Sequence, residues 1–208
     1  IGDLYQIKEH NPDLVRTFIT QLKHRVLEPL PFEEAKKVTK EFNSDYMALV
    51  NQLQGNDMIG VTNQMAEESN PVLYGQIAAT LLNVNTVLTN YSDFIKTFLV
   101  TKNMPSSIAY LPSMIRYTAI TSDTDSTIFT VQDWAKWYSG EYVVNEETIG
   151  VAACVVFIAS QSITHILAMM SANIGVAKER LFQISMKNEF RFDVFSPTQE
   201  TKHYYSIY

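Results

Sequence analysis

The segment from Ile115 to Thr130 constrains the fold and the chemistry of this chain more than any other. It consists of an apolar alternating run, an acidic turn from Ser122 to Ser126, and a second alternating run. Alternation with a period of two predicts two strands, and the short polar turn between them predicts a β-hairpin. The turn sets Asp123 beside Asp125, and like charges that close need a cation to hold them. We therefore predict a metal-binding hairpin, with an exposed structural turn as the alternative.

The composition sets limits on the class of protein. With 208 residues, 46% of them hydrophobic and 18% charged, the chain can bury one core, either as one domain or as a compact piece of a larger one. A net charge of -6 gives no basic footprint, which counts against a free-standing nucleic-acid-binding protein. A single cysteine, Cys154, excludes a disulfide framework and a multi-cysteine metal site. Together with the absence of a signal-peptide pattern at the start, it predicts an intracellular, non-secreted protein.

The hydrophobic pattern predicts an α+β fold in which helices come first, a hairpin follows, and a helix and strands end the chain. The long apolar stretch from Gly150 to Met170 contains Gln161 and His165, which are costly in lipid, so it predicts a buried helix and no membrane partner. Because the elements do not alternate strand and helix, the sheet is expected to be antiparallel. The predicted helices span residues 13–27, 32–53, 60–69, 73–100 and 146–173, and the predicted later strands span residues 181–195 and 202–208.

The acidic turn resembles a motif of a known family. Asp123-Thr124-Asp125-Ser126 is similar to the DTDS signature in the palm domain of family B DNA polymerases. In that family such a hairpin carries a carboxylate that binds the catalytic magnesium. The resemblance implies that Asp125 is the first choice for the metal ligand and catalytic residue, and that Asp123 is the second choice.

A second family shares the same letters. Residues 123–127 also satisfy the DxDxT pattern of haloacid-dehalogenase-like phosphotransferases, in which the first aspartate, here Asp123, is the nucleophile. That family places its motif near the start of a parallel α/β fold. Here the motif lies past the middle of the chain and directly before another strand, so the hairpin interpretation is favoured.

Two upstream segments are similar to nucleotide-binding motifs of the polymerase family. Gly2-Asp3-Leu4-Tyr5 is similar to the end of the first palm motif, DxxSLYPS, which implies that Tyr5 stacks under the incoming sugar. The segment from Lys40 to Tyr46 is similar to the fingers motif KxxxNSxYG, which implies that Lys40 holds the triphosphate and that Asn43 and Tyr46 belong to the nucleotide site.

The spacing of the fingers motif leaves alternatives open. Lys40 precedes Asn43 by three residues where the family has four, and one residue turns a helical side chain by about 100°. Lys36 or Lys37 therefore remain alternative phosphate ligands, and a solvated basic helix face is the simpler interpretation of all three lysines. The segment from Asn70 to Gly75, NPVLYG, is a second match to the same motif.

The end of the chain continues the resemblance. Met186-Lys187-Asn188-Glu189 is similar to the palm-strand motif MxxE, and residues 201–204 are similar to the primer-binding segment KKRY. The resemblance implies that Glu189 lies near the metal ions opposite the hairpin, and that Lys202 and Tyr204 contact the primer strand. An exposed strand residue and an edge-strand charge are the structural alternatives for Glu189 and Lys202.

The resemblance implies a palm-like antiparallel sheet with the DTDS hairpin packed against long helices, plus a short helical fingers segment. Residues 1–10 would start the palm, residues 11–100 would form fingers-like and palm helices, and residues 101–208 would carry the hairpin, a helix and thumb-proximal strands.

The expected function is that of a palm and fingers fragment of a divergent, phage-like or virus-like DNA-directed DNA polymerase. It would act on primer-template DNA and a dNTP, with two Mg²⁺ ions and one aspartate ligand from outside this chain. We therefore expect the chain to be inactive without the remaining polymerase domains or subunit. The alternatives are a magnesium-dependent phosphotransferase of the DxDxT type and a non-catalytic, palm-like binding subunit.

Overall fold

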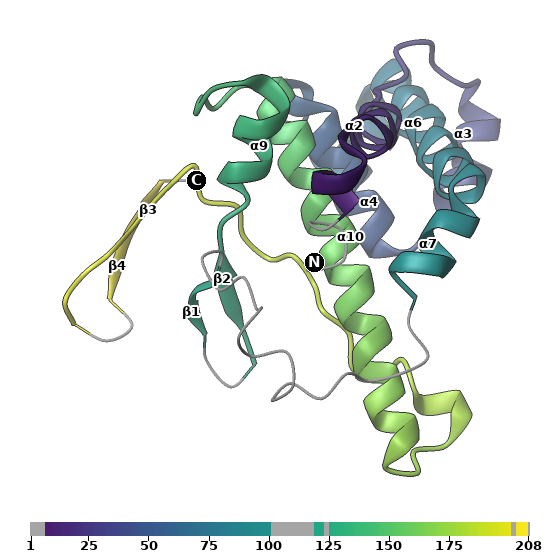
Figure 1. Ribbon diagram of the computed structural model, residues 1–208. Helices are drawn as coiled ribbons and strands as arrows, with labels where there is room; N and C mark the ends of the chain where they lie inside the picture. The colour runs from purple at the N-terminus through teal and green to yellow at the C-terminus, as the bar shows by residue number, and fades with distance from the viewer. Residues whose placement is uncertain (1–6, 101–118, 123–124, 201–202, 208) are drawn as a thin grey trace.

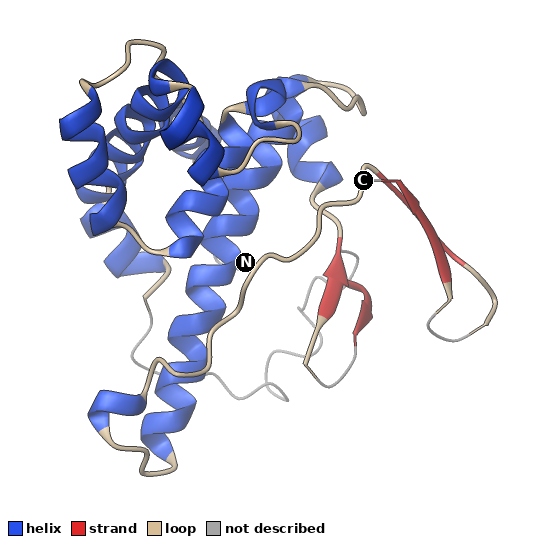
Figure 2. Ribbon diagram, turned by 180° about the vertical axis from the view of Figure 1, so that it is seen from behind, coloured by secondary structure: helices blue, strands red, loops and turns tan. Residues whose placement is uncertain are grey.

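The computed structural model describes residues 7–100, 119–122, 125–200 and 203–207 (Figure 1). Helices make up most of this part of the chain, and its strands form two separate two-stranded antiparallel sheets (Figure 2). The fold is thus mixed helix and antiparallel sheet, in agreement with the predicted α+β class. The helices are α2 Pro12–Leu22, α3 Phe32–Glu41, α4 Ser44–Leu53, α5 Asn63–Ser69, α6 Pro71–Asn90, α7 Ser92–Phe98, α9 Gln132–Ser139 and α10 Glu146–Asn173, with the 3₁₀ turns η1 Gly55–Met58 and η3 Lys178–Arg180.

The hydrophobic core lies between α6 and the helices around it. Helix α6 contacts α2, α3, α4, α5 and α7, while α10 contacts α2, α4 and α9. Burying a large apolar side chain contributes about 1.5–3 kcal/mol, so these helices supply most of the stabilisation. The largest fully buried apolar side chains are Phe18, Leu22, Ile77 and Leu81.

Asparagine side chains set where several helices begin. Asn11, Asn43, Asn70 and Asn145 each accept hydrogen bonds from backbone N–H groups in the first turn of α2, α4, α6 and α10. Asn145, the predicted cap of α10, forms a full capping box with Thr148. The caps satisfy donors that a helix start leaves without partners.

The Asn43 cap explains the clearest error among the helix predictions. A single helix over residues 32–53 is replaced by α3 and α4, because Phe42 is extended (φ −104°, ψ 145°) and Asn43 starts a new helix. The predicted helix over residues 73–100 is likewise divided at Tyr91 into α6 and α7, and the first helix ends at Leu22.

Helices α6 and α10 are both long and apolar enough to cross a membrane by length and composition alone. The core helix of a soluble protein passes the same test, and here 50% of the apolar window of α6 and 44% of that of α10 are buried inside the protein. The first half of α10 is the buried half, with Val151, Cys154 and Phe157 in the core. The second half, beyond Ser160, is mostly only half-buried.

The first sheet is the hairpin that the alternating pattern predicts. Strand β1, Ala119–Ser122, pairs antiparallel with β2, Thr127–Phe129, and Ser122 lies opposite Thr127. All four residues of β1 are exposed, and only Ile128 and Phe129 of β2 are half-buried. The hairpin is therefore less covered by the helices than its apolar flanks predict.

The second sheet is shorter than predicted. Strand β3, Val194–Pro197, pairs antiparallel with β4, Tyr204–Ile207, and Figure 1 shows this hairpin standing away from the helices. The prediction of a strand over residues 181–195 was wrong for all but its end, and Ser196 and Pro197 lie inside β3 instead of ending it. One reason is that the Met186 N–H donates to Thr164 Oγ1 on α10 (2.9 Å) and not to a neighbouring strand.

Candidate functional site

Asp125 lies in the exposed turn that joins β1 to β2. Hydroxyl groups at the ends of the two strands close this turn: Ser122 Oγ donates to the Ser126 carbonyl oxygen (3.3 Å) and lies 3.0 Å from Thr127 Oγ1. An ionised carboxylate that is exposed on such a turn offers two oxygen atoms as ligands. Oxygen ligands of this type are the ones that Mg²⁺ prefers. Asp123, the other predicted ligand, lies outside the described residues.

The carboxylates of the described ranges do not complete a metal site by themselves. In residues 7–100, 119–122, 125–200 and 203–207, no three His, Cys, Asp or Glu side chains lie close enough together to hold a metal ion. Asp125 thus fits as one ligand of a magnesium ion by its chemistry and its position. Further ligands would have to come from other residues or from the substrate's phosphates.

The hairpin is connected to the helical body through α9, which follows β2 after Thr130 and Val131. Trp134 of α9 is buried in the core. The Lys8 ammonium lies 4.6 Å from the centre of the Trp134 ring, so the helical turn of residues 7–10 is held against α9. Burial lowers the pKa of Lys8 below its usual value, although the charges of Glu9 and Asp133 oppose this shift. The start of the described chain and the base of the hairpin therefore meet at α9.

Two of the predicted fingers residues, Asn43 and Tyr46, stabilise the helical body. Asn43 Oδ1 accepts from the backbone N–H groups of Asp45 (3.1 Å) and Tyr46 (3.2 Å) and so caps α4. The Tyr46 ring packs against Phe42 and Phe157, at 5.3 Å between centroids in both pairs. Burial raises the pKa of Tyr46.

The lysines of α3 lie apart from the acidic hairpin. Lys40 is exposed in the last turn of α3, whereas Lys36 forms an ion pair with Glu67 (3.2 Å). In the view of Figure 1, α3 and the β1–β2 hairpin lie on opposite sides of α10. The structure therefore does not bring Lys40 next to Asp125.

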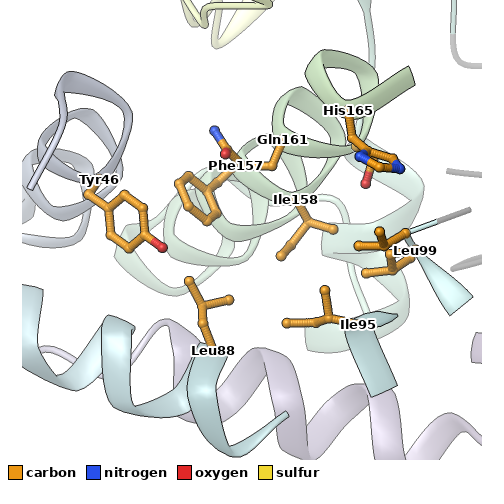
Figure 3. Close-up of a pocket in the computed structure, with 10 residues that line it drawn as sticks. Tyr46, Leu88, Ile95, Leu99, Phe157, Ile158, Gln161 and His165 are labelled. Carbon is orange, nitrogen blue, oxygen red and sulfur yellow. The ribbon is translucent and has the colours of Figure 1, made fainter. Parts of the chain in front are cut away.

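Tyr46 also forms one wall of a cavity of about 250 Å³ between α4, α6, α7 and α10 (Figure 3). The walls are mostly apolar, with Leu88, Ile95 and Ile158 among them, and the Tyr46 hydroxyl points into the space. His165, which the sequence suggests as a core histidine, lies at the far end of this cavity.

The structure brings the fingers-like segment close to the segment that carries Glu189. Ser44 and Asp45 at the start of α4 line a smaller cavity of about 120 Å³ together with Lys187 and Asn188. Asp45 Oδ2 accepts from Gln161 Nε2 of α10 (3.0 Å), which fixes this end of α4. Glu189 is exposed and lies in irregular chain before β3. The prediction that it lies in a strand was therefore wrong.

The predicted primer-binding segment falls partly in the β3–β4 hairpin. Tyr204 of β4 is 45% exposed and packs against Phe195 of β3, at 4.8 Å between ring centroids. Phe192, just before β3, packs against both of these rings. Lys202 and Tyr5, the other residues predicted to contact primer or nucleotide, lie outside the described residues.

Sequence reasoning missed the surroundings of α9. The aromatic cluster after the hairpin, Trp134, Trp137 and Tyr138, is ordinarily explained by packing against the sheet, with base stacking as the alternative. In the structure these rings face cations of α2 and of residues 7–10. The only sequence signal was the local density of aromatic residues, which does not name their partners.

The comparison with known families gives the class of protein to which this chain belongs. The family model of the divergent family B DNA polymerases matches residues 1–208, so the chain belongs to this family. No curated protein and no solved structure matches it. Membership links the chain to DNA replication, to DNA and nucleotide substrates, and to a family that generally uses Mg²⁺.

Proposed function

We propose that this chain provides the palm and fingers region of a DNA-directed DNA polymerase and acts as part of a larger protein or complex. The observation that carries the proposal is the exposed acidic turn of an antiparallel hairpin, with Asp125 at its tip, in a chain that matches the family over its whole length. Its substrates would be primer-template DNA and a dNTP, and it would work inside a cell, where the single buried cysteine Cys154 needs no disulfide partner.

In this proposal the Asp125 carboxylate, with Asp123 beside it in the chain, holds magnesium where the primer end meets the nucleotide. The bound ions would lower the pKa of the primer 3′ hydroxyl and neutralise the charge that develops on the triphosphate. The exposure of Asp125 supports this role, because a ligand that must meet two substrates has to be accessible. Glu189, Tyr5, Lys202 and Tyr204 keep the roles that the family resemblance implies for them in this proposal, whereas Lys40 lies apart from Asp125 (Figure 1).

The antiparallel pairing of β1 with β2 argues against the phosphotransferase alternative. That chemistry needs a parallel strand that ends in a loop and a helix, with the nucleophile at the strand's end. Here the acidic turn is followed directly by a second strand paired with the first. A non-catalytic palm-like subunit is the alternative that the experiment below must separate from the polymerase.

The test is the substitution Asp125→Asn in the intact polymerase. The change keeps the size of the side chain and removes its negative charge, so primer extension should fall to background while the free energy of unfolding stays within about 1 kcal/mol of the original value. Asp93→Asn is the matched control, because Asp93 is also an exposed aspartate and lies on α7. Full extension by Asp125→Asn would contradict the proposal, and an intact protein without any extension activity would support the non-catalytic subunit.

A further inference from the structure

Three cations of the N-terminal part of the chain face three aromatic rings of α9, and we call this group the α9 clamp. It comprises Lys8, Arg16 and Lys23 on one side, and Trp134, Trp137 and Tyr138 on the other. The partners are more than 100 residues apart in sequence. The clamp is thus a tertiary contact that joins the beginning of the chain to the helix after the hairpin.

Arg16 makes the most specific contacts of the clamp. Its guanidinium donates to the carbonyl oxygens of Tyr138 (2.7 Å) and Trp137 (2.9 Å) at the end of α9. It also lies 4.7 Å and 4.8 Å from the centres of the Trp137 and Tyr138 rings. Carbonyls in the last turn of a helix lack partners within the helix, and the planar fork of arginine can bind two of them at once.

Further contacts on both sides of Arg16 hold the same helix. Thr20, one turn along α2, places its hydroxyl 2.5 Å from the Tyr138 hydroxyl. Lys23 lies 5.2 Å from the centre of the Tyr138 ring and also forms an ion pair with Glu147 (3.5 Å). Lys8 lies over both tryptophans, at 4.6 Å and 5.6 Å from their ring centres. Helix α9 is therefore fixed against rotation as well as against displacement.

The orientation of α9 sets where the acidic turn lies, because β2 reaches α9 through only Thr130 and Val131. Val131 packs against the core, and the Gln132 N–H donates to Thr130 Oγ1 (3.2 Å), so this connection is short and held in place. A rotation of α9 would therefore carry the hairpin and Asp125 with it.

We infer that the α9 clamp positions the Asp125 hairpin relative to the N-terminal segment of the chain, and that Arg16 is the main positioning residue for metal binding. The inference rests on the proposed polymerase function. Arg16 does not touch the reacting atoms, since its contacts are with α9. It acts by holding the helix from which the carboxylate is displayed.

The experiment compares Arg16→Met with Arg25→Met in the intact polymerase. Arg25 is a matched control because it is also half-buried and donates to a backbone carbonyl, that of Gln54 (3.1 Å), and to the carboxylate of Asp57, but it makes these contacts away from α9. Two quantities are measured: kcat for primer extension, and Mn²⁺ affinity by electron paramagnetic resonance with a chain-terminated primer and the next dNTP present. The Mn²⁺ measurement does not depend on turnover.

Arg16→Met should weaken Mn²⁺ binding by about tenfold or more, which is the usual effect of replacing a residue that orients a metal ligand. It should lower kcat by about 100-fold, the cost of misplacing a reacting group by about 1 Å. Arg16→Lys should fall between, because an ammonium cannot bind both carbonyls as the guanidinium does. Arg25→Met should lower the thermal stability and leave both quantities unchanged for the folded protein.

Equal effects of Arg16→Met and Arg25→Met, or an unchanged Mn²⁺ affinity in Arg16→Met, would overturn the inference. If Arg16→Met does not fold, Thr20→Val takes its place and should shift both quantities in the same direction by a smaller factor, and no shift would again overturn it. The variant Asp125→Asn distinguishes a failure of the proposed function from a failure of the positioning role of Arg16. Extension by that variant refutes the metal-binding role of Asp125 on which the inference rests, whereas its loss together with normal metal binding in Arg16→Met refutes only the positioning role.

Discussion

Gly75 in the second turn of α6 offers a test of why the NPVLYG segment has a glycine. Replacing glycine by alanine inside a helix ordinarily stabilises it by about 0.8–1.0 kcal/mol. Here a Cβ at position 75 would lie 2.5 Å from the Leu30 carbonyl oxygen and 2.8 Å from Pro29 Cβ. The Leu30 N–H also donates to the Gly75 carbonyl oxygen (3.2 Å), so the loop cannot move away without losing this bond. Gly75→Ala should therefore destabilise the protein.

The size of the effect follows from these opposing contributions. Overpacking against a backbone that is hydrogen-bonded in place costs about 1–3 kcal/mol, and weakening the Leu30–Gly75 bond costs about 0.5–1.5 kcal/mol. Subtracting the helix-propensity gain leaves a net loss of about 0.5–3.7 kcal/mol in the free energy of unfolding. Gly150→Ala in α10 is the matched control, since its nearest neighbour would be Leu53 Cδ2 at 3.6 Å, an ordinary contact. It should gain up to about 1 kcal/mol.

Urea denaturation followed by tryptophan fluorescence measures both variants, with the midpoint and the slope fitted separately. Gly75→Ala as stable as the original protein, or Gly150→Ala destabilised by the same amount, would refute the packing argument. The outcome also bears on the nucleotide site. If Gly75 is needed for the close approach of residues 29–30, the match of NPVLYG to the fingers motif requires no contact with a nucleotide.

Two further predictions concern Asn43 and Lys8. Asn43→Ala should lower the free energy of unfolding by about 0.5–2 kcal/mol, because it removes the cap of α4, and thermal unfolding measures this loss. An unchanged KM for dNTP in the folded variant would show that capping α4 is the whole role of Asn43. Because burial lowers the pKa of Lys8, the unfolded chain binds its proton more strongly than the folded protein does, so stability should rise with pH in the range below about 10.5. Lys8→Met should flatten this rise in denaturation curves taken at increasing pH, and an identical pH dependence in both proteins would contradict the cause assigned to it.

The parts of the fold that local sequence decides were predictable. The start of α10 followed from Asn145 and the acidic residues after it, and its end from Gly175, which has a positive φ of 85°. The β1–β2 hairpin followed from alternation on either side of a polar turn. In each case the residues that determine the element lie within or beside it.

The wrong helix predictions have one physical cause, which is that apolar periodicity continues across helix breaks. Nothing in the pattern stops a helix at Phe42, yet the Asn43 side chain offers the next N–H groups a better partner and a new helix starts there. The wrong strand prediction has another cause: the alternation over residues 181–192 predicts a strand, but it pairs with no strand of the described residues, and the Met186 N–H bonds to Thr164 of α10 instead. Partners distant in sequence decide such cases.

The candidate site likewise has one part that local sequence predicts and another part that only the folded structure shows. The sequence predicts Asp125 as a candidate because its turn is local, while the α9 clamp depends on cations and rings that meet only after folding. The aromatic density of residues 134–142 was visible in the sequence, but Arg16 gave no signal of its own. A lone arginine in an amphipathic helix has the same pattern whether it is solvated or caps another helix.

Helix α10 relates the two groups of candidate residues to each other. Its first half contacts α9, which carries the hairpin, and its middle contacts α4 and, through Thr164, the segment from Met186 to Glu189. Because a helix rises about 1.5 Å per residue and resists bending, the distance between these attachment points is fixed once α10 has formed. The hairpin is joined to α9 through Thr130 and Val131, and the Met186 N–H joins the segment before Glu189 to Thr164 of α10. The position of Asp125 therefore depends on the orientation of α9, which is why the contacts that orient α9 matter for the chemistry proposed at Asp125.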